Sequence, residues 1–491
     1  MHLSKPNDPR PAETIRCDYL VVGSGAGGSV AARELARAGK QVVVAEEGSF
    51  FSIEQFRGPV GALTRQLYRN GGLTPFLGRP SLGFAEASCV GGGTVINGGM
   101  MWRTPPWILE DWEDSHRLSG YQERDLLPHF KTIEQLLQVR TTDNLDGNID
   151  SVVLARSARS LGWKVVPARR ALGDCRNTNR CPTGCPTGAK KSVTLNYLVE
   201  AQRHGANIMP DVRIRSLALR NGRIKEAIGI WKGTRIRFLA DRYFLAAGPI
   251  HTPYLLQRSG LSPLAGRQLR FHINVKFVAM FSDFLNSSYG TIFTEQVQEF
   301  EKRGLYIVAS NWLPHYVAAT LNHQPIAEVE SVLADFNRSG LFAAQVRSRA
   351  RGQILSFSGR PIVWQTLPRE DIETISFAFM KMGTLLFEAG ARKIYLPLQR
   401  EPAVTTLSDL KKVVERMRPG QLDLVSMHAM SSCPMSGRPR QGVVDLEGRV
   451  EGPSNLWICD ASVLPDNIGE SPQETIMAVS HEIVRRHLLS S

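Results

Sequence analysis

The chain has 491 residues, of which 42% are hydrophobic and 21% charged, an ordinary composition for a soluble globular protein that excludes collagen, coiled coils and long disorder. Lys and Arg number 59 against 46 Asp and Glu, and the resulting net charge of +13 suits nucleic acid, an anionic membrane, an acidic substrate or solubility alone. Seven cysteines do not make a disulfide scaffold, and no apolar run approaches the roughly 20 residues that span a bilayer. Because residues 1–16 lack the apolar core of a signal peptide, we expect a cytoplasmic protein and leave a peripheral membrane contact open.

The first predicted elements form a βαβ unit of about 30 residues. A short apolar run over residues 18–22 predicts a strand, the glycine-rich segment 23–28 a turn, and the periodic apolar residues up to 38 a helix. A second strand is predicted over residues 42–45 and ends at Glu46. Dinucleotide-binding proteins use this order of elements.

The turn carries glycines with the spacing Gly23-x-Gly25-x-x-Gly28. The first glycine permits a tight turn, the second lets the backbone approach a pyrophosphate, and the third allows the helix to pack closely on the strand. Glu46 lies 23 residues beyond Gly23, near the spacing expected for an acid that bonds a ribose diol. We therefore predict dinucleotide binding, with a glycine turn that holds no ligand as the alternative.

The rest of the chain shows no tandem repeat and no clean linker. Residues 50–83 are expected to form loops with short helices, and residues 115–203 to be mostly helical. A meander of strands is expected between 207 and 247, followed by alternating strands and helices, of which the helix over 372–388 is the clearest. The last part of the chain, from 429, returns to strand, loop and helix. This order favours domains that are interleaved in sequence.

Three later segments follow the glycine turn in a fixed order. They are ASCVGGGTVINGGMMWR at 87–103, AGPIHTPYLLQRSGL at 247–261, and the block 428–465 that begins HAMSSCPMS. With the βαβ unit, they resemble the signature segments of the glucose–methanol–choline (GMC) oxidoreductase family, whose members use FAD. The resemblance is specific for the family and its cofactor, and says little about the substrate.

By this resemblance the fold class is α/β, with a Rossmann-like FAD-binding domain interleaved with an α+β substrate domain built on an antiparallel sheet. The expected FAD-binding segments are 12–115, 190–265 and 429–491, and the expected substrate segments are 116–189 and 266–428. The implied function is oxidation of a small-molecule alcohol to the carbonyl, with dioxygen, a quinone or a protein as electron acceptor. A lyase or decarboxylase in which the FAD is not a net redox agent is the alternative.

The resemblance also implies which residues hold the cofactor. They are Gly23, Ser24, Gly25, Ala26, Gly28, Glu46, Glu47, Val90, Gly93, Thr94, Asn97, Gly98, Gly99, Met100, Val212, Ala247, Asp460, Ala461, Pro472 and Gln473. In one branch of the family a histidine just before the asparagine is bonded covalently to the flavin. Ile96 occupies that position here, so we expect non-covalent FAD.

Alcohol oxidation needs a base for the hydroxyl proton, and histidine suits this role because its ordinary pKa is about 6.5. Among 11 histidines, His428 aligns with the family's base; a structural histidine is the alternative. Where the family has Asn or His before the last helix, this chain has Ser471. Ser471 either bonds the substrate oxygen or caps the helix together with Glu474, and Glu470 and Asn467 are other candidates for the second partner.

Cys175, Cys181 and Cys185 suggest a metal site at first sight. Their spacing is not C-x2-C and no fourth ligand is evident nearby, so we expect no metal and interpret the segment as a loop packed over the flavin, with a redox-active pair left open.

The positive charge is concentrated in one span. Residues 116–265 carry 24 Lys and Arg against 11 Asp and Glu. No nucleic-acid-binding motif occurs, so nucleic acid is not an expected partner. The basic strands within this span are interpreted as a solvated surface or as a dock for an anionic substrate, an acidic electron partner or a membrane.

Overall fold

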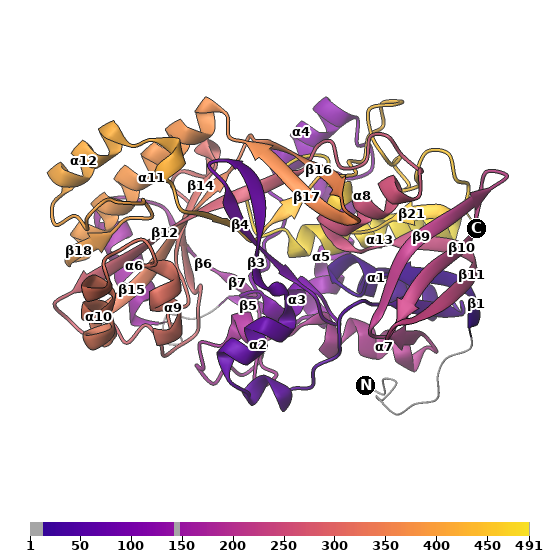
Figure 1. The fold of residues 1–491 in the computed structure, drawn as a ribbon, viewed down its shortest axis with the longest axis horizontal. Coiled ribbons are helices and arrows are strands. Elements are labelled where there is room, and N and C mark those ends of the chain that lie inside the picture. The colour runs from indigo at the N-terminus through magenta and orange to yellow at the C-terminus, as the bar shows by residue number, and fades with distance from the viewer. Residues whose placement is uncertain (1–12, 142–147, 491) are drawn as a thin grey trace.

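Two β-sheets organise the chain, one toward each end of an elongated molecule (Figure 1). The structure is a computed structural model that describes residues 13–141 and 148–490. Each sheet has its own buried apolar core, and chain segments pass between the two several times. The α/β fold class and the interleaving expected from the sequence are confirmed.

The first sheet has the strand order β8-β2-β1-β11-β10-β9, and β21 pairs with the second half of β11. Strands β8, β2, β1, β11 and β21 run parallel, whereas β11, β10 and β9 form an antiparallel meander. Their bounds are β1 Thr14–Val22, β2 Val42–Ala45, β8 Asn207–Met209, β9 Val212–Arg220, β10 Arg223–Trp231, β11 Thr234–Leu245 and β21 Leu456–Ile458. Parallel strands are buried on both faces, which fits the continuous apolar runs of β1 and β2.

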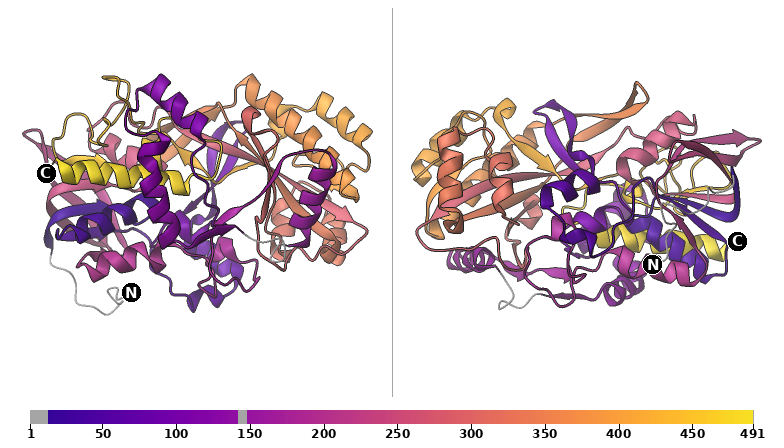
Figure 2. Two further views of the ribbon diagram at one scale, coloured as in Figure 1. Left: turned by 180° about the vertical axis from the view of Figure 1, so that it is seen from behind. Right: turned by 60° about the horizontal axis from the view of Figure 1, so that its bottom comes forward.

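Helices from distant parts of the chain cover this sheet. The long C-terminal helix, α13, packs against α1 and α5, and α7 packs against α1 (Figure 2). The bounds on this side are α1 Ala26–Arg37, α4 Pro106–His116, α5 Glu123–Leu136, α7 Tyr197–Arg203, α8 Gly248–Arg258 and α13 Gln473–Leu489. Close packing of α1 depends on glycine, because a Cβ on Gly27 would lie 1.8 Å from the Cys459 carbonyl oxygen.

The second sheet has the order β16-β17-β3-β4-β19-β12-β15-β14-β13-β6, and β18 and β20 also pair with β12. Its bounds are β3 Tyr68–Arg79, β4 Leu82–Ala87, β6 Val165–Pro167, β12 Arg270–Phe281, β13 Glu295–Val297, β14 Leu305–Ala309, β15 Ser339–Arg347, β16 Arg351–Phe357, β17 Arg360–Thr366, β18 Ala391–Tyr395, β19 Leu424–Ser426 and β20 Ala429–Met430. Most pairs are antiparallel, in agreement with the expected substrate domain.

Helices at the outer end of the molecule cover the second sheet (Figure 1). Their bounds are α6 Ile149–Ser160, α9 Pro314–Thr320, α10 Ile326–Ala334, α11 Arg369–Glu388 and α12 Leu407–Arg416. The remaining short elements are α2 Val60–Leu67, α3 Gly93–Ile96, β5 Val139–Thr141 and β7 Arg169–Ala171. Helix α11 contains the clearest helix predicted from the sequence.

Two segments differ from the sequence prediction. Residues expected to be loops form β3 and the start of β4, and these strands belong to the second sheet although they fall inside the expected FAD-binding segment 12–115. Asn70 and Gly71 have positive φ, and the register shifts between Tyr68 and Leu73, so the regular alternation of a strand is lost from the sequence. Helix α5, expected in the substrate domain, packs in the first core instead.

No helix within residues 13–141 and 148–490 is both long enough and apolar enough to cross a bilayer.

Candidate functional site

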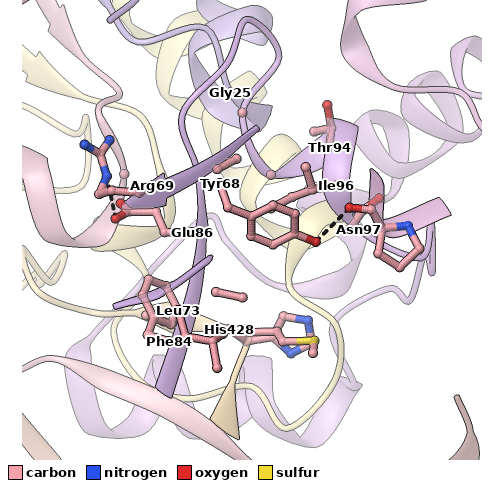
Figure 3. A pocket seen from close by; sticks show the side chains of 18 of the residues that line it. Gly25, Tyr68, Arg69, Leu73, Phe84, Glu86, Thr94, Ile96, Asn97 and His428 are labelled. Carbon is pink, nitrogen blue, oxygen red and sulfur yellow. Dashed lines mark hydrogen bonds and ion pairs between the residues drawn. The ribbon is translucent and has the colours of Figure 1, made fainter. Parts of the chain in front are cut away.

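A cavity of about 880 Å³ lies between the two sheets. The turn after β1, the end of β2 and the segment 92–100 form one side, and strands β12 to β15 with the segment around His428 form the other. In the close-up view of Figure 3, Gly25 and Thr94 lie at one side of the cavity and His428 at the opposite side. Most of the predicted site residues therefore share one continuous space.

The first glycine turn lies where β1 meets α1. Gly23 has a φ of +101°, and a Cβ there would lie 2.2 Å from the Ala246 carbonyl oxygen, so only glycine fits. A Cβ on Gly25 would meet nothing within 4 Å, because this residue faces the open cavity. The N-terminus of the 12-residue helix α1 follows at once, and its free N–H groups can hold the phosphates of a dinucleotide.

Glu46 lies at the end of β2 with its carboxylate almost saturated. It accepts hydrogen bonds from the Ser24 backbone N–H at 2.9 Å, the Ser24 hydroxyl at 2.7 Å and the Gly48 N–H at 2.8 Å. Burial raises the pKa of Glu46, against the effect of these hydrogen bonds. A carboxylate has about four acceptor positions, so one remains for a ribose hydroxyl in the cavity. Ser24 itself joins the two glycine turns, since its oxygen accepts the Gly91 N–H at 3.0 Å.

Glu47, next in the chain, is held by positive charges. It forms an ion pair with Arg69 and lies 3.4 Å from the guanidinium of Arg213. Although burial acts in the opposite direction, the charges of Arg69, His251 and Arg213 lower the pKa of Glu47. Glu47 therefore belongs to an ionised cluster at the rim of the cavity, unlike the enclosed Glu46.

The second glycine turn lies against the first. Gly91 and Gly92 both have positive φ, and a Cβ on Gly92 would lie 3.0 Å from the Cα of Gly25. Thr94 closes the turn by donating its hydroxyl to the Gly91 carbonyl at 2.7 Å. The short helix α3 then presents Ile96 to the cavity, and this side chain has no nucleophilic atom.

Lys190 supports this turn from behind, a role that the sequence did not indicate. Its side chain is 3% exposed, and its ammonium donates to the carbonyls of Val95, Asn97 and Cys181 at 2.5, 2.8 and 2.9 Å. Burial lowers the pKa of Lys190 to about 8. The ammonium is fully used in joining the carbonyls of Val95 and Asn97 to that of Cys181.

His428 faces the cavity and forms a pair with His272 of β12. The two Nδ1 atoms are 3.0 Å apart, and the rings meet edge to face at 90°. Burial lowers the pKa of His428 to about 4, and burial together with the neighbouring His428 ring lowers the pKa of His272 well below its usual range. Both rings are therefore neutral near pH 7.

Two proton arrangements suit this pair. The Gly469 N–H donates to Nε2 of His272 at 3.1 Å, so Nδ1 of His272 carries the proton, and His428 then keeps its own proton on Nε2. In the opposite arrangement Nε2 of His272 carries the proton, and the Gly469 N–H donates to the Asn467 side-chain oxygen at 3.2 Å instead. A hydrogen bond between His272 and the Asn467 side chain favours the protonated form of His272. His428 then donates from Nδ1 and presents a free lone pair on Nε2.

Ser471 also lines the cavity, and it does not cap the last helix. The residue at the N-cap of α13 is Pro472, and no side chain forms a cap hydrogen bond there. The Ser471 hydroxyl contacts only the Met100 sulfur, at 3.9 Å, within the described residues. The predicted capping box with Glu474 is therefore wrong, because the chain enters the helix one residue later and the serine points at the cavity wall.

Residues of the two cofactor blocks meet beside Ser471. The Asn97 amide donates to the Gln473 side-chain oxygen at 2.5 Å, and the Gly99 N–H donates to the Asn97 oxygen at 3.0 Å. Glu470 and Asn467, the other candidates for the second partner, do not line the cavity. The Glu470 carboxyl accepts from the amides of Gln296 and Gln298, and burial raises its pKa to about 8.

The predicted cofactor residues fall into two groups. Those that line the cavity are Gly23, Gly25, Ala26, Glu46, Glu47, Gly93, Thr94, Asn97, Gly98, Met100, Val212, Ala247, Asp460, Ala461, Pro472 and Gln473. The others do not line it: Ser24, Gly28, Val90 and Gly99. Asp460 is saturated by the Gly248 N–H and by the hydroxyls of Thr252 and Ser462, so it orders the wall.

The cysteine segment packs beside the second glycine turn. Cys175 accepts a hydrogen bond from the Thr291 hydroxyl at 2.8 Å, and Cys181 is buried beneath Lys190. No cluster of three His, Cys, Asp or Glu side chains suited to a metal ion occurs among the described residues.

Sequence reasoning missed His272, although a signal for it exists. Along β12 the polar residues His272, Asn274 and Lys276 alternate with the buried apolar residues Ile273 and Val275. This alternation indicates a strand with one polar face, and that face lies on the cavity.

The two apposed glycine turns, the acid at the end of β2 and the helix N-terminus define a dinucleotide-binding α/β protein whose site faces a second sheet. Models described as GMC oxidoreductase match residues 64–274 and 358–480, and a model described as FAD binding domain matches residues 18–57. The chain belongs to the GMC oxidoreductase family and has its FAD-binding domain.

Named relatives are similar over nearly the whole chain. An uncharacterized GMC-type oxidoreductase of Mycobacterium tuberculosis is 33% identical over 473 residues, which cover 95% of this chain and 75% of that protein. A long-chain-alcohol oxidase of Arabidopsis thaliana is 26% identical, over 96% of this chain and 68% of that protein. The crystal structure of pyridoxine 4-oxidase from Mesorbium loti has the same fold, with a TM-score of 0.74, 16% identity, and coverage of 96% and 99%.

Proposed function

We propose that this oxidoreductase converts a CH–OH group of a small molecule to the carbonyl with FAD as hydride acceptor. The observation that carries the proposal is that His428 and Ser471 face the same cavity as the two glycine turns and the Asn97–Gln473 pair. Relatives that are named alcohol oxidases support the same reaction class. When bound, FAD supplies a hydride acceptor at flavin N5.

The cofactor site fits FAD without a covalent bond. Gly25 and Gly93 leave open space on the cavity side, where a Cβ would meet nothing within 4 Å. We assign the pyrophosphate to the turn at Gly23–Ala26 and a ribose hydroxyl to the remaining acceptor position of Glu46. We assign the flavin to the wall formed by Thr94, Asn97 and Gln473. Ile96 offers no atom for a covalent link, so acid precipitation should release the yellow colour from the protein.

His428 is the proposed acid–base group. Uptake of the hydroxyl proton at Nε2 requires the arrangement in which Nδ1 of His428 donates to His272 and His272 donates to Asn467. In the other arrangement Nε2–H of His428 holds the substrate oxygen by donating to it. The Ser471 hydroxyl lies in the same wall and can donate the second hydrogen bond to that oxygen.

The test is an anaerobic screen of hydroxy compounds for bleaching of the flavin absorbance in the FAD-loaded protein. We expect the rate to fall about 10²-fold or more in His428→Ala, and to stay within about twofold in His204→Ala, a change at an exposed histidine. A near-normal rate in His428→Ala would remove this residue from the mechanism. Turnover of a compound without any bleaching would favour the lyase or decarboxylase alternative.

The domain division is proposed in revised form. The expected FAD-binding segments 12–115, 190–265 and 429–491 are retained without the β3–β4 hairpin, which pairs within the second sheet. Helix α5 joins them, because it packs against α13. The electron acceptor is proposed to be dioxygen, a quinone or a protein, and the name oxidase carried by the relatives favours dioxygen.

A further inference from the structure

The wall of the cavity beyond His428 is a polar face of the second sheet. Strand register places Asn274 of β12, Gln345 of β15 and Tyr306 of β14 side by side in one row. The next row, farther from His272 along β12, contains Lys276, Ala343, Val308 and Gln296. Side chains from both rows line the cavity. Because side chains alternate along a strand, these residues share one face with His272.

The first row holds one amide group that is buried without a partner and a tyrosine that lines the cavity. Asn274 is 8% exposed and its Nδ2 forms no hydrogen bond with any described residue. Tyr306 is 1% exposed, and within the described chain no hydrogen bond of its hydroxyl is found. Burying such groups without partners is unfavourable. An alkyl chain lying over this row would leave them unpaired, whereas a substrate with hydrogen-bonding groups would pair them.

The second row holds a cation. The Lys276 ammonium lies within ion-pair distance of no acid among residues 13–141 and 148–490. Burial lowers the pKa of Lys276, and the charge of Asp423, which lines the same cavity, acts in the opposite direction without the two groups meeting. Gln296 is already engaged with Glu470 and Gln298. Lys276 is therefore the group in this row that can still pair with an anion.

We propose that the substrate is a polar hydroxy acid, with its CH–OH group at His428, its hydrogen-bonding groups over Asn274 and Tyr306, and its carboxylate at Lys276. Lys276 lies four positions beyond His272, about 13 Å along the strand, so the hydroxyl and the carboxylate lie at opposite ends of a molecule of medium length. This substrate class rests on the proposed function and differs from the long-chain alcohols in the names of several relatives.

The test compares matched six-carbon compounds by anaerobic flavin bleaching in the FAD-loaded protein: 6-hydroxyhexanoate, 1,6-hexanediol and 1-hexanol. The carboxylate should lower the half-saturating concentration about tenfold or more relative to the diol, because a charge-assisted hydrogen bond to the ammonium is added. That advantage should disappear in Lys276→Met and persist in Lys276→Arg. It should also persist in Lys232→Met, a change at an exposed lysine of the first sheet.

The outcomes separate the substrate class from the proposed function. If 1-hexanol reduces the flavin with a half-saturating concentration equal to or below that of the hydroxy acid, the hydroxy-acid proposal is wrong and the oxidation stands. If no compound bleaches the flavin, binding of hexanedioate is measured by its perturbation of the flavin spectrum. If hexanedioate binds and Lys276→Met abolishes this binding, the anion site is supported although the proposed oxidation is wrong. If hexanedioate does not bind, the anion site is wrong as well.

Discussion

At the scale of single residues, the His428–His272 pair sets the working pH of the site. Burial lowers the pKa of His428 to about 4, so the ring is neutral and able to accept a proton above that value. The anaerobic rate of flavin bleaching should therefore stay level from pH 8 down to about 5 and fall only as the pH passes through 4. A fall centred near 6.5, the ordinary value for histidine, would contradict the burial of this ring.

His272 positions His428 through one hydrogen bond, and its loss has a distinctive readout. His272→Phe removes the hydrogen-bond partner of Nδ1 of His428, which fixes the position of the proton on that ring. We expect the bleaching rate to fall about tenfold or more and the pH profile to move, while half-saturation by the hydroxy compound changes little. A variant that loses only thermal stability, with its pH profile in place, would assign His272 a purely structural role.

Lys190 is the second residue whose role depends on burial. Lys190→Met removes three hydrogen bonds, two to the carbonyls of Val95 and Asn97 and one to that of Cys181, so the free protein should retain FAD about tenfold less well. Its neighbour Lys191 is half-buried and donates only to the Gly188 carbonyl at 3.4 Å, so Lys191→Met is the matched control. The affinity of both variants for FAD is measured as the dissociation constant when the FAD-free protein is reconstituted with FAD. Equal values for the two variants would argue against the supporting role of Lys190.

At the scale of elements, the first turn of α13 carries an acid that is protonated at neutral pH. Burial and the adjacent Glu134 raise the pKa of Glu474 to about 8. A carboxyl whose pKa is raised on folding stabilises the fold most at low pH and loses that contribution as the pH rises toward 8. Glu474→Gln should therefore match the native chain near pH 5 and exceed its free energy of unfolding by at least about 1 kcal/mol near pH 9. Denaturant unfolding at the two pH values measures both free energies. A Glu474→Gln variant that is less stable than the native chain by the same amount at both pH values would contradict the prediction.

Helices and strands whose apolar residues recur with a regular period could be predicted from the sequence. Elements whose structure depends on pairing or packing with other segments could not. The βαβ unit, the β9–β11 meander and helix α11 follow from apolar runs, alternation and helical spacing. Strand β3 was missed because its positive-φ residues and the register shift against β4 hide the alternation, and its other partner, β17, lies far along the chain. Helix α5 falls in the segment 116–189 that the resemblance assigned to the substrate domain, yet it packs in the first core against α13. The sequence does not show which element a helix packs against.

The cofactor-binding part of the candidate site could be predicted because its residues form a short sequence motif. The spacing of the glycines and the acid after β2 are both visible within that motif. His272 and Lys190 required the fold, because their roles depend on strand register and on carbonyls from separate segments. A cap was one of two interpretations of Ser471, because Ser-Pro-x-Glu is a common helix start, and the structure begins the helix after Pro472 instead.

At the scale of the whole molecule, the cavity joins two cores, so its ligand should stabilise both. A ligand that binds only the folded chain adds about 2.7 kcal/mol when present at 100 times its dissociation constant. Removal of FAD should lower the melting temperature in a single transition, and added FAD should restore it. Two transitions, of which only one responds to FAD, would indicate that the two sheets unfold independently.

The structure also shows where the basic residues behind the net charge of +13 lie. Exposed side chains of β9, β10 and β11 carry much of it: Arg220, Arg223, Lys225, Arg235 and Arg237. Arg213 and Arg215 instead line the cavity. The basic character therefore belongs mainly to a solvated sheet surface, and Lys276, inside the cavity, is the cation that bears on substrate choice.

The central claim is that the flavin takes the electrons of a CH–OH group, and the stoichiometry of one anaerobic turnover tests it most directly. The FAD-loaded protein is mixed with an excess of a hydroxy compound that bleaches it, the flavin is quantified by absorbance, and the carbonyl product is measured after quenching. We predict one carbonyl for each flavin bleached. Product formed in multiple turnovers while the flavin spectrum stays oxidised would contradict the claim.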